Sequence, residues 1–160
     1  MSGAGTPGEL RAREAEIGAE TTRLLQLVPF EGVSGDWAAL TRKHRDMLEI
    51  LETAQRRRRE LVPPAKAQAA WEGYLAAVDE QLVAERAVLA ATETRSYDAY
   101  RAAVRALALV IPKRTAASAA AGLRQRSVRQ RASLWIGLPR FILRAQRHAR
   151  AERRAGRSWS

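Results

Sequence analysis

The stretch 61–121 constrains the fold of this chain more than any other. It holds two long segments in which apolar residues recur every three or four positions, one after Pro63 and Pro64 and one after a polar turn at 92–96. That spacing places the apolar side chains on one face of a helix. Because proline fits the first turn of a helix but not its interior, the two prolines mark a boundary. The stretch therefore predicts a helical hairpin that supplies half of a small bundle.

The helix predicted for about 64–91 carries two adjacent apolar stripes. Trp71 and Leu82 belong to one stripe, and Tyr74 and Val88 belong to the other. Because an apolar surface this wide has to be buried against two neighbours, the helix is expected to pack against two others. We expect Trp71 to anchor the core, so that its replacement by alanine costs about 3–5 kcal/mol.

The following helix is predicted to begin after Ser96, whose side chain can cap it, with Asp98 favourably placed in the first turn. Pro112 lies inside the helical pattern of this segment. Because proline lacks an N–H and its ring clashes with the carbonyl of Ala108, a kink or a break is expected there. Helical composition resumes afterwards, and Gly122 is predicted to be the C-terminal cap.

Two further helices precede the hairpin. The first is predicted for about 9–28 and is stopped by Pro29, since the residue before a proline resists helical angles. The second is predicted to begin near Ser34 or Gly35, with Asp36 in its first turn. Its apolar residues form a heptad-like seam, which is typical of bundle packing.

Four consecutive arginines at 56–59 stand near the C-terminus of the second helix. Cations at this end of a helix complement its macrodipole, so the run is interpreted as structural. Glu49, Glu52 and Glu60 lie within one or two turns of the run and are expected to neutralise part of its charge.

Together these segments predict an all-α protein, a small antiparallel four-helix bundle with a basic, partly helical C-terminal tail. The bundle is predicted for 9–121, after a disordered N-terminus at 1–8 and before a basic amphipathic tail at 122–160. Alanine, leucine, arginine and glutamate dominate the 160 residues, and these are strong helix formers. The sparse β-branched residues argue against a sheet.

The sequence argues against most kinds of catalysis. It contains no cysteine, which excludes disulfides, thiolate metal sites and cysteine nucleophiles. Its two histidines, His44 and His148, lack the preceding glutamate of a Glu-x-x-His metal motif. There is no glycine-rich phosphate loop and no serine in a nucleophile elbow. We therefore predict a protein that is not an enzyme, with no cofactor, no metal and no small-molecule substrate, and His44 is interpreted as a satisfied or half-buried histidine rather than a metal ligand.

The net charge of +11 is concentrated at the C-terminal end of the chain. Residues 1–112 carry 15 Lys and Arg against 16 Asp and Glu, whereas residues 113–160 carry 13 Lys and Arg against a single acid, Glu152. Such a basic segment indicates an anionic partner, either nucleic acid or an anionic lipid surface. The alternative is that a general bias toward arginine and alanine leaves the segment merely solvated.

The tail also contains a tight apolar cluster at 134–143, which Gly137 and Pro139 divide into two short helical segments. Arginines alternate with its apolar face at helical spacing, which is the pattern of a membrane-surface segment or of a helix that docks in the groove of a partner protein. The alternative is that the cluster folds back onto the bundle. The predicted anionic-surface residues are Arg140, Arg144, Arg147, Arg150 and Arg154, and the predicted apolar anchor is formed by Trp135, Phe141 and Ile142.

Three stretches resemble a family of short, uncharacterised actinobacterial helical-bundle proteins that are often exported or lipid-anchored. They are EIGAETTRLLQLVP at 16–29, ELVPPAKAQAAWEGYLAAVDEQL at 60–82 and AAAGLR at 119–124. The resemblance implies a bundle over about 9–124 and no catalytic residues. Members usually carry one cysteine near the position of Gly18 and another after the Gly-Leu pair, and both are missing here together with an export signal. Loss of both cysteines suits a reducing compartment.

Three hypotheses of function follow. The first is a non-catalytic helical-bundle protein whose tail engages an anionic surface, with the membrane favoured. The second is an accessory protein that binds nucleic acid through the tail, and the third is an exported structural module. The expected location is cytoplasmic or peripheral to the membrane, and export stays open if the start of the chain is mis-assigned. The oligomeric state is left open.

Overall fold

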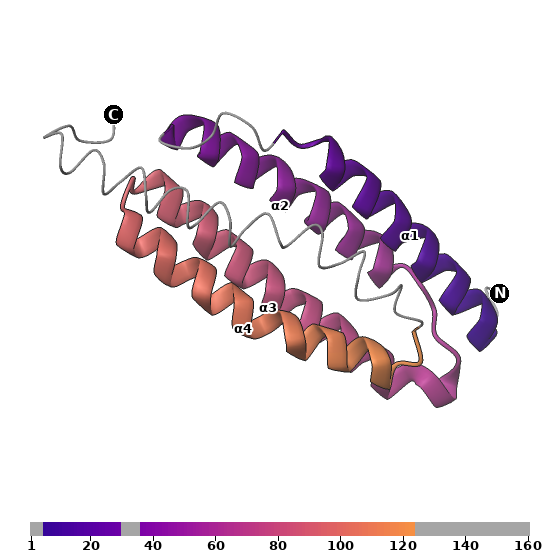
Figure 1. Ribbon diagram of the computed structural model, residues 1–160. Helices are drawn as coiled ribbons and strands as arrows, with labels where there is room; N and C mark the ends of the chain where they lie inside the picture. Colours follow the sequence, from indigo (N-terminus) through magenta and orange to yellow (C-terminus); the bar gives the residue numbers. More distant parts are fainter. Residues whose placement is uncertain (1–4, 30–35, 124–160) are drawn as a thin grey trace, which may run out of the picture.

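The computed structural model describes residues 5–29 and 36–123, and within these ranges the chain is all-helical, with no strand. Four long helices form a bundle (Figure 1), which confirms the predicted fold class. A short 3-10 helix precedes the third of them. The elements are α1 (Pro7–Leu27), α2 (Trp37–Arg59), η1 (Ala65–Ala67), α3 (Gln68–Glu93) and α4 (Tyr97–Ala120).

The helices form two antiparallel hairpins, α1 with α2 and α3 with α4 (Figure 1). Helix α3 joins them, because it packs against α4 on one side and against α2 on the other. This bears out the expectation that a wide apolar surface on α3 contacts two neighbours. Helix α1 rests mainly on α2.

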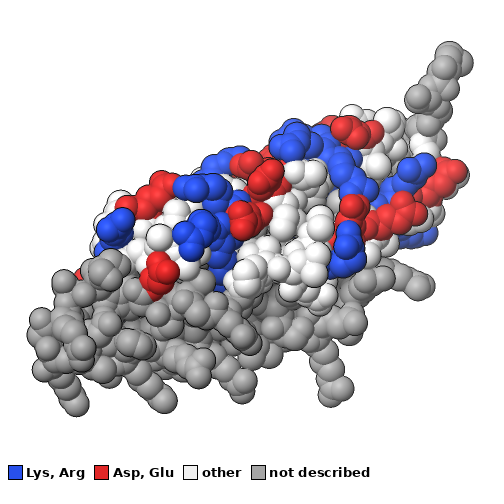
Figure 2. Space-filling model, turned by 90° about the horizontal axis from the view of Figure 1, so that it is seen from above, with Lys and Arg blue, Asp and Glu red and all other residues white. Residues whose placement is uncertain are grey.

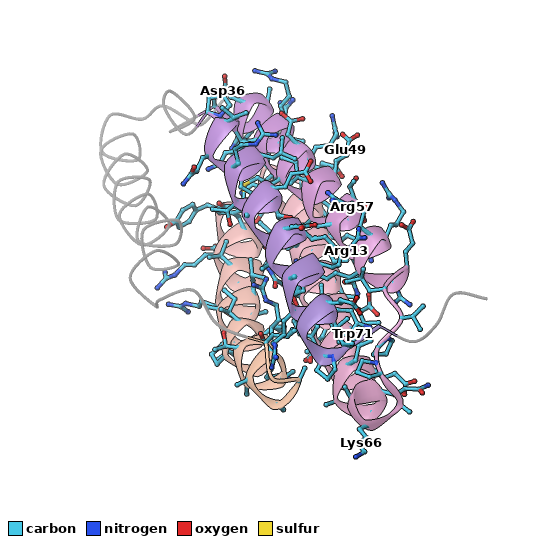
Figure 3. All side chains as sticks on the ribbon, turned by 90° about the vertical axis from the view of Figure 1, so that its right-hand side faces the viewer. Arg13, Asp36, Glu49, Arg57, Lys66 and Trp71 are labelled. Carbon is cyan, nitrogen blue, oxygen red and sulfur yellow. The ribbon has the colours of Figure 1, made fainter. Side chains whose placement is uncertain are left out.

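The buried apolar residues fall into two clusters near opposite ends of the bundle. Trp71 belongs to one and lies toward the end that carries Lys66, whereas Asp36 marks the other end, beside Trp37 (Figure 3). Trp71 is 2% exposed, as the periodicity of its segment predicts. The Trp71 cluster contains Leu10, Trp71, Tyr74, Val78 and Leu123, and the Trp37 cluster contains Trp37, Leu40, Val88, Ala91, Tyr100, Val104 and Leu107.

The starts of α1 and α2 are set by side-chain caps. Thr6 and Glu9 form a capping box at the start of α1, with Pro7 in the first turn. Asp36 is the N-cap of α2, because its Oδ1 accepts a hydrogen bond from the backbone N–H of Ala39 at 3.0 Å. The prediction that placed Asp36 inside the first turn was therefore wrong, since its carboxylate satisfies an N–H that the first turn leaves unpaired.

The segment after Pro63 and Pro64 forms one turn of 3-10 helix before α3 begins at Gln68. The predicted start of the long helix at Pro64 was therefore one turn too early. The backbone N–H of Ala67 donates to the carbonyl of Pro64 at 2.8 Å, which closes that tighter turn.

Helix α4 confirms the Ser96 cap, whose hydroxyl accepts from the N–H of Ala99 at 3.2 Å, and places Asp98 in the first turn. A break at Pro112 does not occur, because α4 runs continuously through it. Pro112 and Ala108 are both exposed, so water can satisfy the carbonyl that the proline leaves without a donor.

Gly122 ends α4 as predicted, with a φ of 68°. Its N–H donates to the carbonyl of Ala119 at 3.0 Å, and the N–H of Leu123 donates to the carbonyl of Ser118 at 3.1 Å. This pair of hydrogen bonds is a Schellman motif, which favours glycine at the left-handed position. The motif directs the buried Leu123 back into the Trp71 cluster.

Candidate functional site

The residues that the sequence singles out for anionic-surface binding all lie outside the described residues. This holds for the five predicted surface arginines and for the three residues of the apolar anchor. The residues are Arg140, Arg144, Arg147, Arg150, Arg154, Trp135, Phe141 and Ile142.

Buried polar side chains are the part of the described bundle in which chemistry could take place. Two groups of them are linked by hydrogen bonds or charge, and we name these the Arg58 cluster (Glu14, Arg58 and Tyr74) and the Glu85 cluster (His44, Gln81, Glu85 and Tyr100). Buried polar groups of this kind need hydrogen-bond partners, and perturbed ones mark candidate active sites.

The Arg58 cluster ties three helices together. The Arg58 Nε donates to both carboxylate oxygens of Glu14, at 3.0 and 3.2 Å, and the Tyr74 hydroxyl donates to Glu14 Oε1 at 2.7 Å. The Arg58 and Glu14 side chains are only 8% and 12% exposed. Burial raises the pKa of Tyr74 to about 12, so the phenol keeps its proton. Charge and hydrogen bonds are thus matched inside the cluster, which suits a structural role.

The other members of the arginine run are also paired across helices. Arg56 donates to Thr53 Oγ1 at 2.8 Å on its own helix, whereas the other three reach carboxylates on α1 and α3. These contacts agree with the structural interpretation of the run. They differ from the expected neutralisation by Glu49, Glu52 and Glu60, because the paired carboxylates belong to other helices. The three pairs are Arg57–Glu20, Arg58–Glu14 and Arg59–Asp79.

His44 is 4% exposed and contacts Tyr100 of the Trp37 cluster, so it is more deeply buried than the half-buried histidine that was expected and only partly satisfied. Its Nε2 lies 3.1 Å from the Tyr100 hydroxyl, and the two rings meet edge to face with centroids 5.7 Å apart. Its Nδ1 has no hydrogen-bond partner among the described residues. Burial, helped by the neighbouring charge of Lys43, lowers the pKa of His44 to about 4, so the ring is neutral at pH 7.

Glu85 is the described carboxyl whose pKa is displaced furthest upward. Burial raises its pKa to about 7, although a hydrogen bond from Gln81 and the charge of Arg114 act in the opposite direction. The Gln81 Nε2 lies a long 3.5 Å from Glu85 Oε1, and Arg114 Nη1 donates to Gln81 Oε1 at 2.7 Å. A buried carboxyl with a pKa near 7 can exchange a proton, and the polar groups that act on it or feel its charge are Gln81, Arg114 and Tyr100.

Sequence reasoning missed both clusters. The available signal for Glu85 was its spacing, since it stands four residues after Gln81 and three before Val88, on the buried face of α3. The pairing of Glu14 with Arg58 joins residues 44 positions apart and leaves no local signal. Within 5–29 and 36–123, no group of three or more His, Asp or Glu side chains could hold a metal ion.

The comparisons with known proteins add no relative. No family model, curated protein or solved structure matches this chain. The resemblance to actinobacterial helical-bundle proteins therefore stays a hypothesis. Among the helices of the described ranges, none combines the length and the apolar character needed to cross a membrane.

Proposed function

We propose that this protein is a non-catalytic helical bundle that uses its basic C-terminal segment, 124–160, to bind an anionic membrane surface. The distribution of charge carries the proposal. The segment contains 11 arginines and a single acid, Glu152. Each cation close to an anionic leaflet contributes about 1 kcal/mol to binding.

The bundle supports this division of roles because its own charges neutralise one another. Lys113 and Arg114 belong to the basic end of the sequence, yet in α4 they bond to Glu80 and Gln81. Over the α1/α2 side of the molecule, basic and acidic side chains are interspersed (Figure 2). That side offers no large single-sign patch that would compete with the arginine-rich segment for an anionic partner.

The apolar residues of the segment favour a membrane over nucleic acid. Trp135, Phe141 and Ile142 stand in a compact apolar cluster among the arginines. Amphipathic segments bind bilayers by burying apolar area as well as by attracting anionic lipid. Binding to duplex nucleic acid depends instead mainly on phosphate contacts and is lost steeply as salt is raised.

Vesicle flotation of the full chain tests the proposal. We expect the protein to float with vesicles that contain phosphatidylserine and not with phosphatidylcholine alone, and the bound fraction to fall as salt is raised. A triple change of Arg140, Arg144 and Arg147 to glutamine should weaken binding by about 100-fold, since about 3 kcal/mol of attraction is lost.

A matched control removes the same charge from the bundle. Arg11, Arg42 and Arg105 are exposed on α1, α2 and α4, so their replacement by glutamine should leave flotation nearly unchanged. Equal binding to neutral and anionic vesicles, absence of binding, or equal losses in both triple variants would contradict the proposal. Replacing Trp135, Phe141 and Ile142 with alanine should weaken flotation; an intact gel shift on DNA with no flotation would favour nucleic acid instead.

A further inference from the structure

The outward side of the α3/α4 hairpin is unusually apolar for a chain with 28% charged residues. Exposed residues recur along each helix at intervals of three and four, so each set shares one helix face. We name the combined surface the hairpin face. It consists of Gly73, Ala76, Glu80, Val83, Ala87 and Ala90 on α3, and Ala102, Ala106, Leu109, Lys113, Ala116 and Ala120 on α4.

The two sets form one continuous surface. The Lys113 Nζ donates to Glu80 Oε1 at 2.6 Å across the hairpin, which places both sets on the same side. Glu80 and Lys113 are the two charged members of this set and neutralise each other, and the exposed Glu72 and Arg105 lie at its edges. The two large apolar residues are also well exposed, Val83 at 62% and Leu109 at 73%. The largest exposed apolar patch of a protein is often functional.

Helix α2 shows that this surface is not a general property of the bundle. Six of the eight exposed positions on α2 are charged. On α4, by contrast, three of the eleven exposed positions are charged, namely Asp98, Arg105 and Lys113. The charged exposed positions on α2 are Arg42, Arg45, Asp46, Glu49, Arg56 and Arg59.

We infer that the hairpin face is the surface through which two copies of this chain associate into a symmetric dimer. The size of the face fits a weak interface. The face spans 73–90 on α3 and 102–120 on α4, each about 26 Å long, and two helices side by side are about 20 Å wide. The face therefore covers about 500 Å² per copy and about 1,000 Å² for the pair, at the lower bound for a specific interface. Small side chains let the facing helices approach to about 8 Å.

The charges of Glu80 and Lys113 favour a second copy of this chain as the partner and indicate its orientation. A two-fold axis parallel to the helices places α3 of one copy opposite α4 of the other. Glu80 of each copy then lies next to Lys113 of both copies, and the four charges alternate in sign. A two-fold axis across the helices would instead bring α3 against α3 and place the two glutamates together.

Sedimentation equilibrium of the full chain, without lipid, tests the inference. We expect the average mass to rise with concentration from 17.7 kDa toward twice that value. Leu109→Glu should weaken the dimer at least tenfold, because it places one new carboxylate from each copy in the apolar centre of the interface. The matched control is Leu27→Glu on α1, a leucine that is 69% exposed outside the hairpin face, and it should leave association unchanged.

A charge exchange tests the orientation. Glu80→Lys should weaken association, because the alternating set becomes four cations, and Glu80→Lys combined with Lys113→Glu should restore it. Glutamate and lysine are good helix formers at these exposed positions, so the variants should retain their circular dichroism. A monomer at every concentration, equal effects of Leu109→Glu and Leu27→Glu, or failure of the double exchange to restore association would overturn the inference. None of these outcomes depends on whether the C-terminal segment binds vesicles.

Discussion

The two hairpins of this bundle are built with different physical chemistry. Arginines of α2 add charged pairs to the α1/α2 hairpin, and the buried Arg58 binds Glu14, which also accepts a hydrogen bond from Tyr74. The α3/α4 hairpin is closed mainly by apolar contact, in which Val88 packs with Tyr100 and Leu107. Their outward surfaces differ in the same way, charged over α2 and apolar over α3 and α4. Charged pairs thus supplement the apolar contacts of Trp37 and Leu40 in the first hairpin, whereas the second depends mainly on apolar area.

The largest expected effect is at Trp71, where the two hairpins meet. Replacement by alanine removes the central side chain between Leu10 of α1 and Leu123 after α4, and the free energy of unfolding should fall by about 3–5 kcal/mol. Urea unfolding measures the loss. A decrease below about 1 kcal/mol would show that the Trp71 cluster does not join the hairpins as described.

Arg58→Ala should lower the free energy of unfolding by about 3–4 kcal/mol, because it leaves the carboxylate of Glu14 buried without its cation. Arg59→Ala on the same helix is the matched control. Its pair with Asp79 is largely exposed, so the loss should stay below about 1 kcal/mol. Equal losses from the two variants, measured by the same urea titration, would remove the distinction between buried and exposed pairs.

Glu85→Gln should raise the unfolding free energy relative to the parent protein at high pH, because it removes a buried ionisable group from α3. The pKa of Glu85 is raised from 4.5 to about 7 in the folded protein. Below pH 4.5 both states hold the proton, and between pH 4.5 and 7 only the unfolded state releases it. Stability contributed by this group is therefore lost as pH rises through that window and stays level above it.

The measurement for Glu85→Gln is the difference in unfolding free energy between variant and parent at the same pH. It should increase by about 3.5 kcal/mol from below pH 4.5 to above pH 7, since each pKa unit corresponds to about 1.4 kcal/mol. Titrations of His44 and of other groups occur in both proteins and cancel. A difference that does not change with pH would contradict the buried, protonated state of Glu85.

The smallest expected effect is at Arg95, which joins α3 to α4 with a φ of 52°. This left-handed conformation is unfavourable for a residue with a side chain and natural for glycine. Arg95→Gly should therefore raise the unfolding free energy by about 0.5–1 kcal/mol. Thermal unfolding measures the change, and a destabilised variant would mean that the Arg95 side chain contributes more than its backbone conformation costs.

Sequence reasoning succeeded where the cause of a structure is local. Periodicity identified the long helices and the buried Trp71, and the chemistry of caps identified Ser96 and Gly122. It left open whether Pro112 kinks or ends its helix, and α4 continues through it, because the cost of an interior proline depends on whether its surroundings are exposed.

Pairs between distant residues escaped prediction for a related reason. Glu14 and Tyr74 are 60 positions apart, and only the packing of α1 on its neighbours brings them together. The raised pKa of Glu85 likewise depends on which helix face is buried and on what faces it. The predicted anionic-surface residues lie outside the described ranges and stay predictions.

The central claim is that the bundle and the arginine-rich segment have separate roles. Shortening the chain to residues 1–123 keeps all four helices and Leu123. Flotation with phosphatidylserine vesicles, measured beside urea unfolding for the full and shortened chains, tests the claim most directly. The account predicts that unfolding free energy is retained and vesicle binding is lost in the shortened chain. Retained flotation, or a loss of several kcal/mol of stability, would contradict it.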